Sequence, residues 1–338
     1  MIRSIKKVAV VIINFNGENY LKKFLPSVVN CSDKNISDIY IIDNCSSDNS
    51  IGFIKINYPE INIINHNKNY GFAEGYNKGL KNISSEYLVL LNNDVEVTKN
   101  WLNPMLKKME NNKLIGACQP KILSYNEKNK FEYAGACGGY LDLLGYPFCR
   151  GRIFDHIEKD IGQYDDDKEI FWASGACIMV KNEIFKKIGG FDKSFFAHME
   201  EIDLCWRIKA EGYINYCYPE SVVYHLGGGT LNYESSKKTY LNFRNNLLMI
   251  AKNEETKSLF IKLSIRFIFD FIASIRFLIL KRSLIKFLSV LKAYLYFLKK
   301  FPKLIITKRK TIVNKLEKSN KIIPIEYFLK AKKRFSDL

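Results

Sequence analysis

Four short apolar runs in the N-terminal part of the chain alternate with stretches of helical periodicity. The runs are Val8–Ile13, Ile39–Ile42, Ile61–Ile64 and Tyr87–Leu91. Tyr20–Asn30 and Phe72–Asn82 are two of the helical stretches between them. Apolar runs of this length predict buried strands, and strands that alternate with helices form βαβ units. The pattern therefore predicts an open α/β sheet with parallel strands.

Polar side chains follow all four of these predicted strands. The exits read Asn14-Phe15-Asn16-Gly17, Asp43-Asn44, Asn65-His66-Asn67 and Asn92-Asn93-Asp94. Asn and Asp are good turn residues, which explains any one of these exits. Open α/β sheets, however, bind their ligands outside the carboxyl ends of the strands. Four such exits along one edge therefore favour a polar ligand there.

The pattern is less regular after Trp101. A buried strand is predicted over Phe171–Val180, followed by a helix over Asn182–Ile188 and a turn at Gly189-Gly190. Another helix is predicted over Asp203–Glu211.

The C-terminal part of the chain is strongly basic. The 338 residues have a net charge of +17, and from Lys252 onward 22 Lys and Arg stand against 6 Asp and Glu. Within it, Ser258–Lys300 is predicted to form two consecutive amphipathic helices, whose charges lie on one arc while the rest is apolar. The basic residues on these helices are Lys262, Arg266, Arg276, Lys281, Arg282, Lys286 and Lys292.

Basic amphipathic helices of this kind suit an anionic membrane surface. No stretch reaches the ~18 uncharged residues that a membrane span needs, so the expected contact is peripheral. A helical hairpin that packs against the body or against a partner is the alternative. Nucleic acid is disfavoured as a partner, because the apolar face is too continuous for a surface that follows phosphates.

The cysteines and the N-terminus indicate the compartment. The eight cysteines form no C-x-x-C pair, and their number is far too small for a disulfide scaffold. The run Val8–Ile13 is too short for the core of a secretory signal. The sequence therefore predicts a reduced, cytoplasmic protein, and the basic helices suggest a peripheral position on the inner face of the cell membrane.

Three segments carry side chains suited to chemistry. Asp94 follows a buried strand, where a carboxylate can hold a divalent cation against phosphates, although Asn-Asn-Asp is also a common turn. Glu200, Glu201 and Asp203 lie at the start of a helix, whose dipole stabilises acids. A carboxylate beside another acid has a raised pKa, which suits a general base, but periodicity does not tell which acid acts. His225 precedes three glycines and could be a ligand, although a lone histidine is more often structural.

Several enzyme classes lack their required motif in this chain. Serine hydrolases need a G-x-S-x-G elbow, dinucleotide-dependent oxidoreductases a G-x-G-x-x-G after the first strand, and P-loop enzymes a Gly-Lys-Ser/Thr ending; none of these occurs. A nucleotidyltransferase of similar topology would need a basic Gly-rich loop after Ile13, where Asn14-Phe15-Asn16-Gly17 stands instead.

Eight motifs follow one another between Lys7 and Asn246: VVIINFNG, IIDNCSSDNS, NYGFAEGYNKGL, LLNNDVEV, SGACIMVKNEIFKKIGGFD, FFAHMEEIDLCWRIKAEGY, YHLGGGT and FRNNLL. In this order they resemble the family 2 inverting glycosyltransferases of GT-A fold, in particular the rhamnosyltransferase-like branch. The resemblance implies an α/β domain over residues 1–250, with a Rossmann-like central mixed sheet flanked by helices. Residues 251–338 would form a basic amphipathic helical extension that associates with a membrane.

The resemblance also implies a role for individual residues. Glu201 would be the catalytic base, and Asp94 with His225 would hold Mg²⁺ or Mn²⁺. The residues expected to bind the donor are Asn14, Asn16, Asp43, Asn69, Gly71, Asn77, Asn93 and Asp94. The residues expected on the acceptor side, or supporting it, are Glu200, Asp203, Arg207 and Trp172.

The implied donor is a nucleotide-sugar linked to dTDP, UDP or GDP, with dTDP-rhamnose the first to consider. The implied acceptor is a hydroxyl of a glycan or lipid-linked glycan in surface polysaccharide biosynthesis. Two departures from the family pattern bear on activity. Asn92 replaces the first acid of the D-x-D metal motif, and Glu201 replaces an Asp, so that its carboxylate reaches about one methylene further. A catalytically silent nucleotide-sugar-binding or scaffold protein of the same fold is therefore the alternative.

Overall fold

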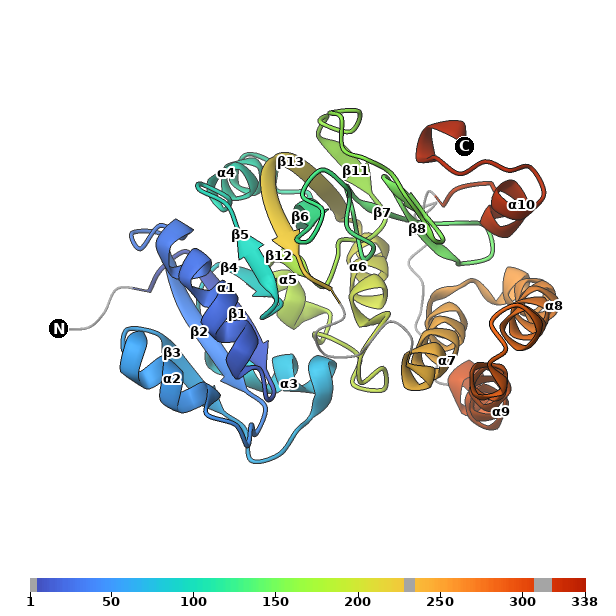
Figure 1. Ribbon diagram of the computed structural model, residues 1–338, viewed down its shortest axis with the longest axis horizontal. Coiled ribbons are helices and arrows are strands. Elements are labelled where there is room, and N and C mark those ends of the chain that lie inside the picture. Colours follow the sequence, from blue (N-terminus) through green and yellow to red (C-terminus); the bar gives the residue numbers. More distant parts are fainter. Residues whose placement is uncertain (1–4, 228–234, 307–317) are drawn as a thin grey trace.

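A central mixed β-sheet organises the computed structural model, which describes residues 5–227, 235–306 and 318–338 (Figure 1). The strand order is β11-β13-β6-β12-β4-β1-β2-β3, and β5 pairs with β13 beside this path. The bounds are β1 Val8–Asn14, β2 Ser37–Asp43, β3 Asn62–Asn65, β4 Tyr87–Leu91, β5 Val95–Val97, β6 Ile115–Ser124, β11 Lys168–Ile170, β12 Cys177–Lys181 and β13 Ile214–His225. Strands β1 to β4 pair in parallel, as predicted, while β12 lies antiparallel to β4 and β6.

Helices cover both faces of the sheet, so the central strands are buried on both sides. The helices of this part are α1 Glu18–Cys31, α2 Ser50–Asn57, α3 Gly71–Gly79, α4 Asn103–Asn111, α5 Asn182–Lys187 and α6 Glu200–Ala210, and a 3₁₀ turn over Leu80–Asn82 extends α3. Alternate residues of β1 enter two separate cores: Val10 packs with residues of α1 and α4, and Val11 with residues of α3 and α6. This double burial explains why β1 reads as an unbroken apolar run.

The predicted strand over Phe171–Val180 is wrong in its first half. Only Cys177–Lys181 forms a strand, because Phe171 and Trp172 turn away to bond with Gly139 of a small second sheet. That sheet joins β7 Gly139–Leu141, β8 Pro147–Cys149, β9 Arg152–Ile153 and β10 His156–Ile157, in the region where the sequence showed no clear pattern. The helix predicted over Asp203–Glu211 begins three residues earlier, at Glu200.

Four helices follow β13: α7 Ser236–Asn253, α8 Thr256–Ile279, α9 Leu284–Ile306 and α10 Ile323–Phe328, with a last 3₁₀ turn over Phe335–Asp337. The two helices predicted within Ser258–Lys300 are confirmed as α8 and α9. They lie side by side against α7, at the far end of the molecule from β1 to β3 (Figure 1). Among the described residues, no helix is long and apolar enough to cross a bilayer.

Two of the basic residues on these helices, Arg266 and Lys262, pair with acids of the protein and do not belong to its exposed charge. The Arg266 guanidinium is buried, 3.1 Å from Asp270 and 3.6 Å from the centre of the Tyr146 ring. Lys262 pairs with Glu254 at 2.8 Å. Acids supplied by α8 itself and by the end of α7 therefore draw these two cations inward.

Candidate active site

The loops after β1, β2 and β4 meet at the carboxyl edge of the sheet. Asn14 ends β1 and lies in register with Asp43, the last residue of β2. The Asn14 Nδ2 atom donates to Asp43 Oδ1 at 3.3 Å and to Ser46 Oγ at 3.1 Å. Asn93 Nδ2, from the loop after β4, donates to Asn14 Oδ1 at 3.2 Å. The expected meeting of polar exits on one edge is confirmed for these three loops.

The turn after β1 requires the small residue Gly17. A Cβ atom there would lie 2.3 Å from Asn14 Oδ1 and 2.4 Å from Asn93 Nδ2. Asn16 beside it is exposed with a φ of 49°, and its Oδ1 accepts a hydrogen bond from the Ser47 amide at 2.7 Å. The Asn16 side chain thus lies at the surface of this loop cluster, whereas Asn14 is buried beneath it.

The loop before α3 is built around Asn44. Its Nδ2 donates to Asn69 Oδ1 at 3.0 Å and to the Gly71 carbonyl at 2.9 Å. Gly71 has a φ of 76°, and a Cβ atom there would lie 2.5 Å from the Phe196 ring. Both the backbone conformation and the ring therefore require glycine. Gly71 brings this loop against the segment that precedes α6.

Asn77 on α3 ties the same helix to the turn after α5. Its Nδ2 donates to the Phe191 carbonyl at 2.7 Å, and its Oδ1 accepts from the Phe191 amide at 2.8 Å. Both polar groups of the Asn77 side chain are therefore used within the fold. The donor-binding role of Asn77 stays a prediction.

Strands β5 and β13 bring Asp94 and His225 together, because His225 lies opposite Val95 in their antiparallel pairing. His225 Nε2 is 3.1 Å from Asp94 Oδ1, and His225 Nδ1 is 3.3 Å from Glu132 Oε1. All three side chains are buried. Burial lowers the pKa of His225, but the charges of Asp94 and Glu132 outweigh burial and raise this pKa to about 10. The imidazole is thus held between two carboxylates.

The pair Asp94 and His225 fits a divalent cation with few protein ligands. Asp94 Oδ1 and His225 Nε2 lie 3.1 Å apart, and a carboxylate oxygen and an imidazole nitrogen are both common metal ligands. Glu132 lies beside the other ring nitrogen, the usual place of the group that orients a metal-bound histidine. In the described parts of the chain, no group of three or more His, Cys, Asp or Glu is arranged to hold a metal ion by itself. The residues Gly228–Thr230 of the motif after His225 lie outside the described residues.

Glu201 lies beside the exit of β4. A Cβ atom on Gly175 would be 3.6 Å from Glu201 Cγ and 3.7 Å from Glu201 Cδ, so this side chain runs along Gly175. The next residue, Ala176, accepts a hydrogen bond from the Asn92 amide at 3.0 Å. The carboxylate of Glu201 is therefore on the side of the sheet where Asn92, Asn93 and Asp94 leave β4.

Burial raises the pKa of Glu201 to about 7, although backbone hydrogen bonds act in the opposite direction. Burial and the charge of Glu201 together raise the pKa of Glu200 well above its ordinary value. A carboxylate whose pKa is close to neutral can both accept and release a proton at physiological pH. This environment and the contact with Gly175 support Glu201 as the base.

Three residues in the segment before α6 have a left-handed backbone, which is unfavourable for residues other than glycine. They are Phe196 with φ 64°, His198 with φ 70° and Met199 with φ 71°. Asn245 on α7 holds this segment: its Nδ2 is 3.0 Å from the carbonyl oxygen of Phe195, 2.8 Å from that of Ala197 and 2.7 Å from that of His198. Helix α7 therefore positions the start of α6, where Glu200 and Glu201 lie.

Asp203, Arg207 and Trp172 make their polar contacts within the fold, and their role beside the acceptor stays a prediction. Asp203 is buried and accepts from Arg207 Nε at 2.8 Å and from Asn253 Nδ2 at 2.7 Å, which links α6 to α7. The Trp172 indole packs on Gly139 and donates from Nε1 to the Tyr140 carbonyl at 2.9 Å. Its exposed fraction is 3%. Trp172 thus belongs to the core in this structure.

Glu132 and Asn245 are two site residues that the sequence did not reveal. Asn245 stands in the FRNNLL motif, which was a signal of resemblance without an assigned role. Glu132 stands in no motif, and only the pairing of β6 with the segment after it brings it to His225.

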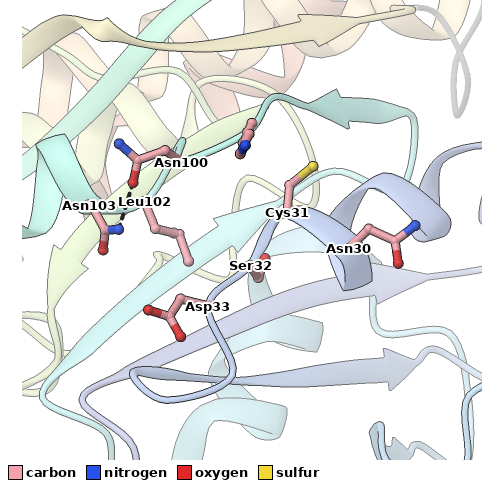
Figure 2. Close-up of a pocket in the computed structure, with 8 residues that line it drawn as sticks. Asn30, Cys31, Ser32, Asp33, Asn100, Leu102 and Asn103 are labelled. Carbon is pink, nitrogen blue, oxygen red and sulfur yellow. Dashed lines mark hydrogen bonds between the residues drawn. The ribbon is translucent and has the colours of Figure 1, made fainter.

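A surface pocket of about 220 Å³ lies between the end of α1 and the start of α4 (Figure 2). Asn30 to Asp33 at the end of α1 face Asn100, Leu102 and Asn103 across it. An Asn103–Asn100 hydrogen bond of 2.6 Å closes one side. None of the residues expected to bind the donor, the metal or the acceptor lines this pocket.

Residues 9–189 match glycosyl transferase family 2, so the chain belongs to this family and transfers a sugar from a nucleotide-sugar. The predicted fold and enzyme class are confirmed.

The curated relatives agree with this assignment, and the solved structures share the fold. A low-salt glycan biosynthesis hexosyltransferase, Agl10 of Haloferax volcanii, is 24% identical over 71% of this chain and 74% of its own length. The N-acetylglucosaminyl-diphospho-decaprenol L-rhamnosyltransferase of Mycobacterium tuberculosis is 22% identical over 64% and 75%. The structure of S. aureus TarS 1-349 with UDP-GlcNAc has a TM-score of 0.56 and 15% identity, covering 89% of this chain and 83% of the TarS 1-349 chain. GalNAc-T7 with UDP, GalNAc and Mn²⁺ also has a TM-score of 0.56, at 16% identity over 74% of this chain; the match spans 48% of GalNAc-T7.

Proposed function

We propose that this glycosyltransferase inverts the anomeric centre of its donor and transfers the sugar to a hydroxyl of a glycan or lipid-linked glycan during surface polysaccharide biosynthesis. Residues 1–250 would carry the reaction. The observation that carries the proposal is the position of Glu201: it lies along Gly175, beside the exit of β4, with its pKa raised to about 7.

In the proposed reaction, Glu201 removes the proton of the acceptor hydroxyl while the oxygen of that hydroxyl attacks the anomeric carbon. The new carbon–oxygen bond forms as the bond to the diphosphate breaks, and the nucleoside diphosphate leaves with the electron pair. A single displacement of this kind inverts the anomeric configuration. General base catalysis contributes about 10²–10⁴-fold to the rate.

The neighbouring residues divide the remaining tasks. Asp43, Asn14 and Asn16 would line the nucleoside side of the donor, because they occupy the exits of β1 and β2. Asp94 and His225 would hold Mg²⁺ or Mn²⁺, which would supply positive charge for the diphosphate. Solved structures of the same fold contain Mn²⁺ with UDP, which supports a divalent cation here.

Rhamnose from dTDP-rhamnose is the first donor to test. The support comes from the rhamnosyltransferases among the relatives, of Mycobacterium tuberculosis and, at 25% identity over 61% of this chain, WbbL of Escherichia coli. The name of the former also supports a lipid-linked diphosphate acceptor. UDP- and GDP-linked sugars are the other candidates, since UDP-GlcNAc is the ligand of TarS.

The test is the release of nucleoside diphosphate by the purified chain from dTDP-rhamnose and from a panel of UDP- and GDP-sugars. Each donor is assayed with and without Mn²⁺, and with membrane lipid extract as acceptor. Mn²⁺-dependent release from one donor would support the proposal and identify the sugar. Tight nucleotide binding without turnover of any donor would favour the silent binding protein, the alternative that Asn92 in place of an acid suggests.

A further inference from the structure

We propose that the outer face of the α8–α9 hairpin docks on an anionic membrane surface. This docking face consists of large apolar side chains that α8, α9 and the turn between them expose to solvent. Ile268 and Ile272 on α8 are each 58% exposed, and around the turn Ile279, Leu280, Leu284 and Ile285 are 56–68% exposed. An apolar surface of this extent is unusual for a monomeric water-soluble protein and marks a binding surface.

From Arg266 onward, the opposite side of α8 is polar and is buried in the protein. Arg266, Asp270 and Ser274 are buried, and Asp270 accepts hydrogen bonds from the hydroxyls of Tyr146 and Tyr294 at 2.7 Å each. An ordinary surface helix buries its apolar side and exposes its polar side, so α8 has the reverse arrangement. Turning the helix over would break a buried ion pair and two hydrogen bonds. The apolar side is therefore fixed toward the outside.

The exposed charges around the docking face are of one sign. Between Thr256 and Ile306 the chain contains a single acid, Asp270, and this acid is buried. Arg276, Lys281, Arg282, Lys292, Lys299 and Lys300 are exposed in the same segment. Two copies of this face would bring like charges together, which opposes self-association. An anionic lipid surface instead complements both the charge and the apolar side chains.

The shape of the hairpin suits insertion at the interface of a bilayer. Its turn, residues 280–283, places Lys281 and Arg282 between Leu280 and Leu284. Long basic side chains can reach lipid headgroups while neighbouring apolar side chains enter the acyl region. The inner face of a cell membrane carries the anionic lipids this requires.

Docking by this face would also connect the membrane to the catalytic segment. Helix α9 packs along α7, and α7 carries Asn245, which holds the segment before Glu200. The hairpin is therefore attached to the reaction site through one helix. This inference does not depend on the proposed sugar transfer, because vesicle binding is measured without any substrate.

The experiment is co-sedimentation of the full chain with vesicles of phosphatidylcholine alone and of phosphatidylcholine with phosphatidylglycerol, at ~150 mM salt. The wild-type chain is expected to bind the anionic vesicles at least about tenfold more tightly than the vesicles of phosphatidylcholine alone. The double variant Ile279→Ser and Ile285→Ser should weaken this binding about tenfold or more. The double variant Lys281→Gln and Arg282→Gln should reduce the preference for anionic lipid. The binding to vesicles that remains in this variant should be less sensitive to salt.

The matched control substitutes Ile56→Ser and Ile161→Ser, which are 79% and 83% exposed on other parts of the surface. All these variants change exposed side chains, so thermal melting should show the wild-type fold. Failure of the wild-type chain to bind anionic vesicles would overturn the proposal, as would equal loss of binding in the control. A lipid-free dimer that the Ile279 and Ile285 substitutions dissociate would overturn it in favour of a second copy of the chain.

Discussion

Replacement of Asn245 by Ala tests whether α7 positions the segment that carries the catalytic base. The Asn245 side chain is buried against three backbone carbonyls that precede α6. Each buried acceptor that loses its donor costs about 1–3 kcal/mol, and the amide has two N–H protons, so the free energy of unfolding would fall by about 2–6 kcal/mol if the segment stays in place. An unfolding entropy of about 0.7 kcal/mol per kelvin for a chain of this length converts this to a fall in Tm of about 3–9 °C.

Relaxation of the segment is the other response to Asn245→Ala. Phe196, His198 and Met199 have unfavourable backbone conformations that the three hydrogen bonds help to hold. When they relax, Glu201 moves with the start of α6, and a displacement of about 1 Å can lower the rate about 10²-fold. We therefore expect kcat to fall at least tenfold and nucleotide affinity to fall less, because this segment contacts the donor-binding residues through Phe196 and Gly71.

The matched control is Asn246→Ala. Asn246 is also buried on α7, but its side chain donates to the Gly145 carbonyl at 2.9 Å and accepts from Arg266, away from the segment before α6. The Tm of this variant should fall about as much as that of Asn245→Ala. Its kcat should stay within about threefold of the wild-type value at a temperature where both variants are folded. Equal losses of kcat in the two variants, or wild-type kcat in Asn245→Ala, would refute the positioning role.

Three further predictions concern pH and the loop before α3. Activity should rise as the pH passes through about 7, because Glu201 must be deprotonated to accept a proton; a flat kcat profile from about pH 5.5 to 8.5 would contradict this. The raised pKa of Glu201 also means that the folded state binds this proton more tightly than the unfolded chain, so its contribution to stability is lost as pH rises from 4.5 toward 7. Glu201→Gln should therefore reduce the fall in Tm between about pH 5 and 8, and an unchanged fall would argue against the raised pKa. Gly71→Ala should lower the free energy of unfolding by about 1–3 kcal/mol because of the φ of 76°, and by a further amount because the added Cβ clashes with Phe196. It should also weaken donor binding in a nucleotide titration. Gly189→Ala has a similar φ of 81° with no atom within 4 Å of the added Cβ, so equal effects of the two substitutions would show that the Phe196 contact is unimportant.

The parallel half of the fold is predictable because its strands are buried on both faces. Val8 to Ile12 are almost fully buried, and such strands appear in the sequence as unbroken apolar runs between polar exits. The rule that an unbroken apolar run forms a buried strand fails at Phe171 and Trp172. They are as apolar as a strand, but they pack against a hairpin at Gly139, a long-range contact that a local pattern does not contain.

The candidate site is predictable where it follows a strand directly and not where it depends on distant pairing. Asn14, Asp43 and Asp94 are identified by their position after apolar runs. The contact of Asp94 with His225 depends on the pairing of β5 with β13, and Glu132 joins them from a segment without a recognisable motif. Arg266 shows the same limit on the helices: a basic residue on an amphipathic helix is expected in solvent until its contacts with Asp270 and Tyr146 are known.

The most direct test of the proposed chemistry compares Glu201→Gln with the wild-type chain, using the donor that supports nucleoside diphosphate release. Glu60→Gln is the control, because Glu60 is an exposed glutamate between α2 and β3. We predict that Glu201→Gln lowers kcat about 10²–10⁴-fold while the dissociation constant of the nucleotide and the activity of Glu60→Gln stay near their wild-type values. Wild-type kcat in Glu201→Gln, or a product that retains the anomeric configuration of the donor, would contradict the account.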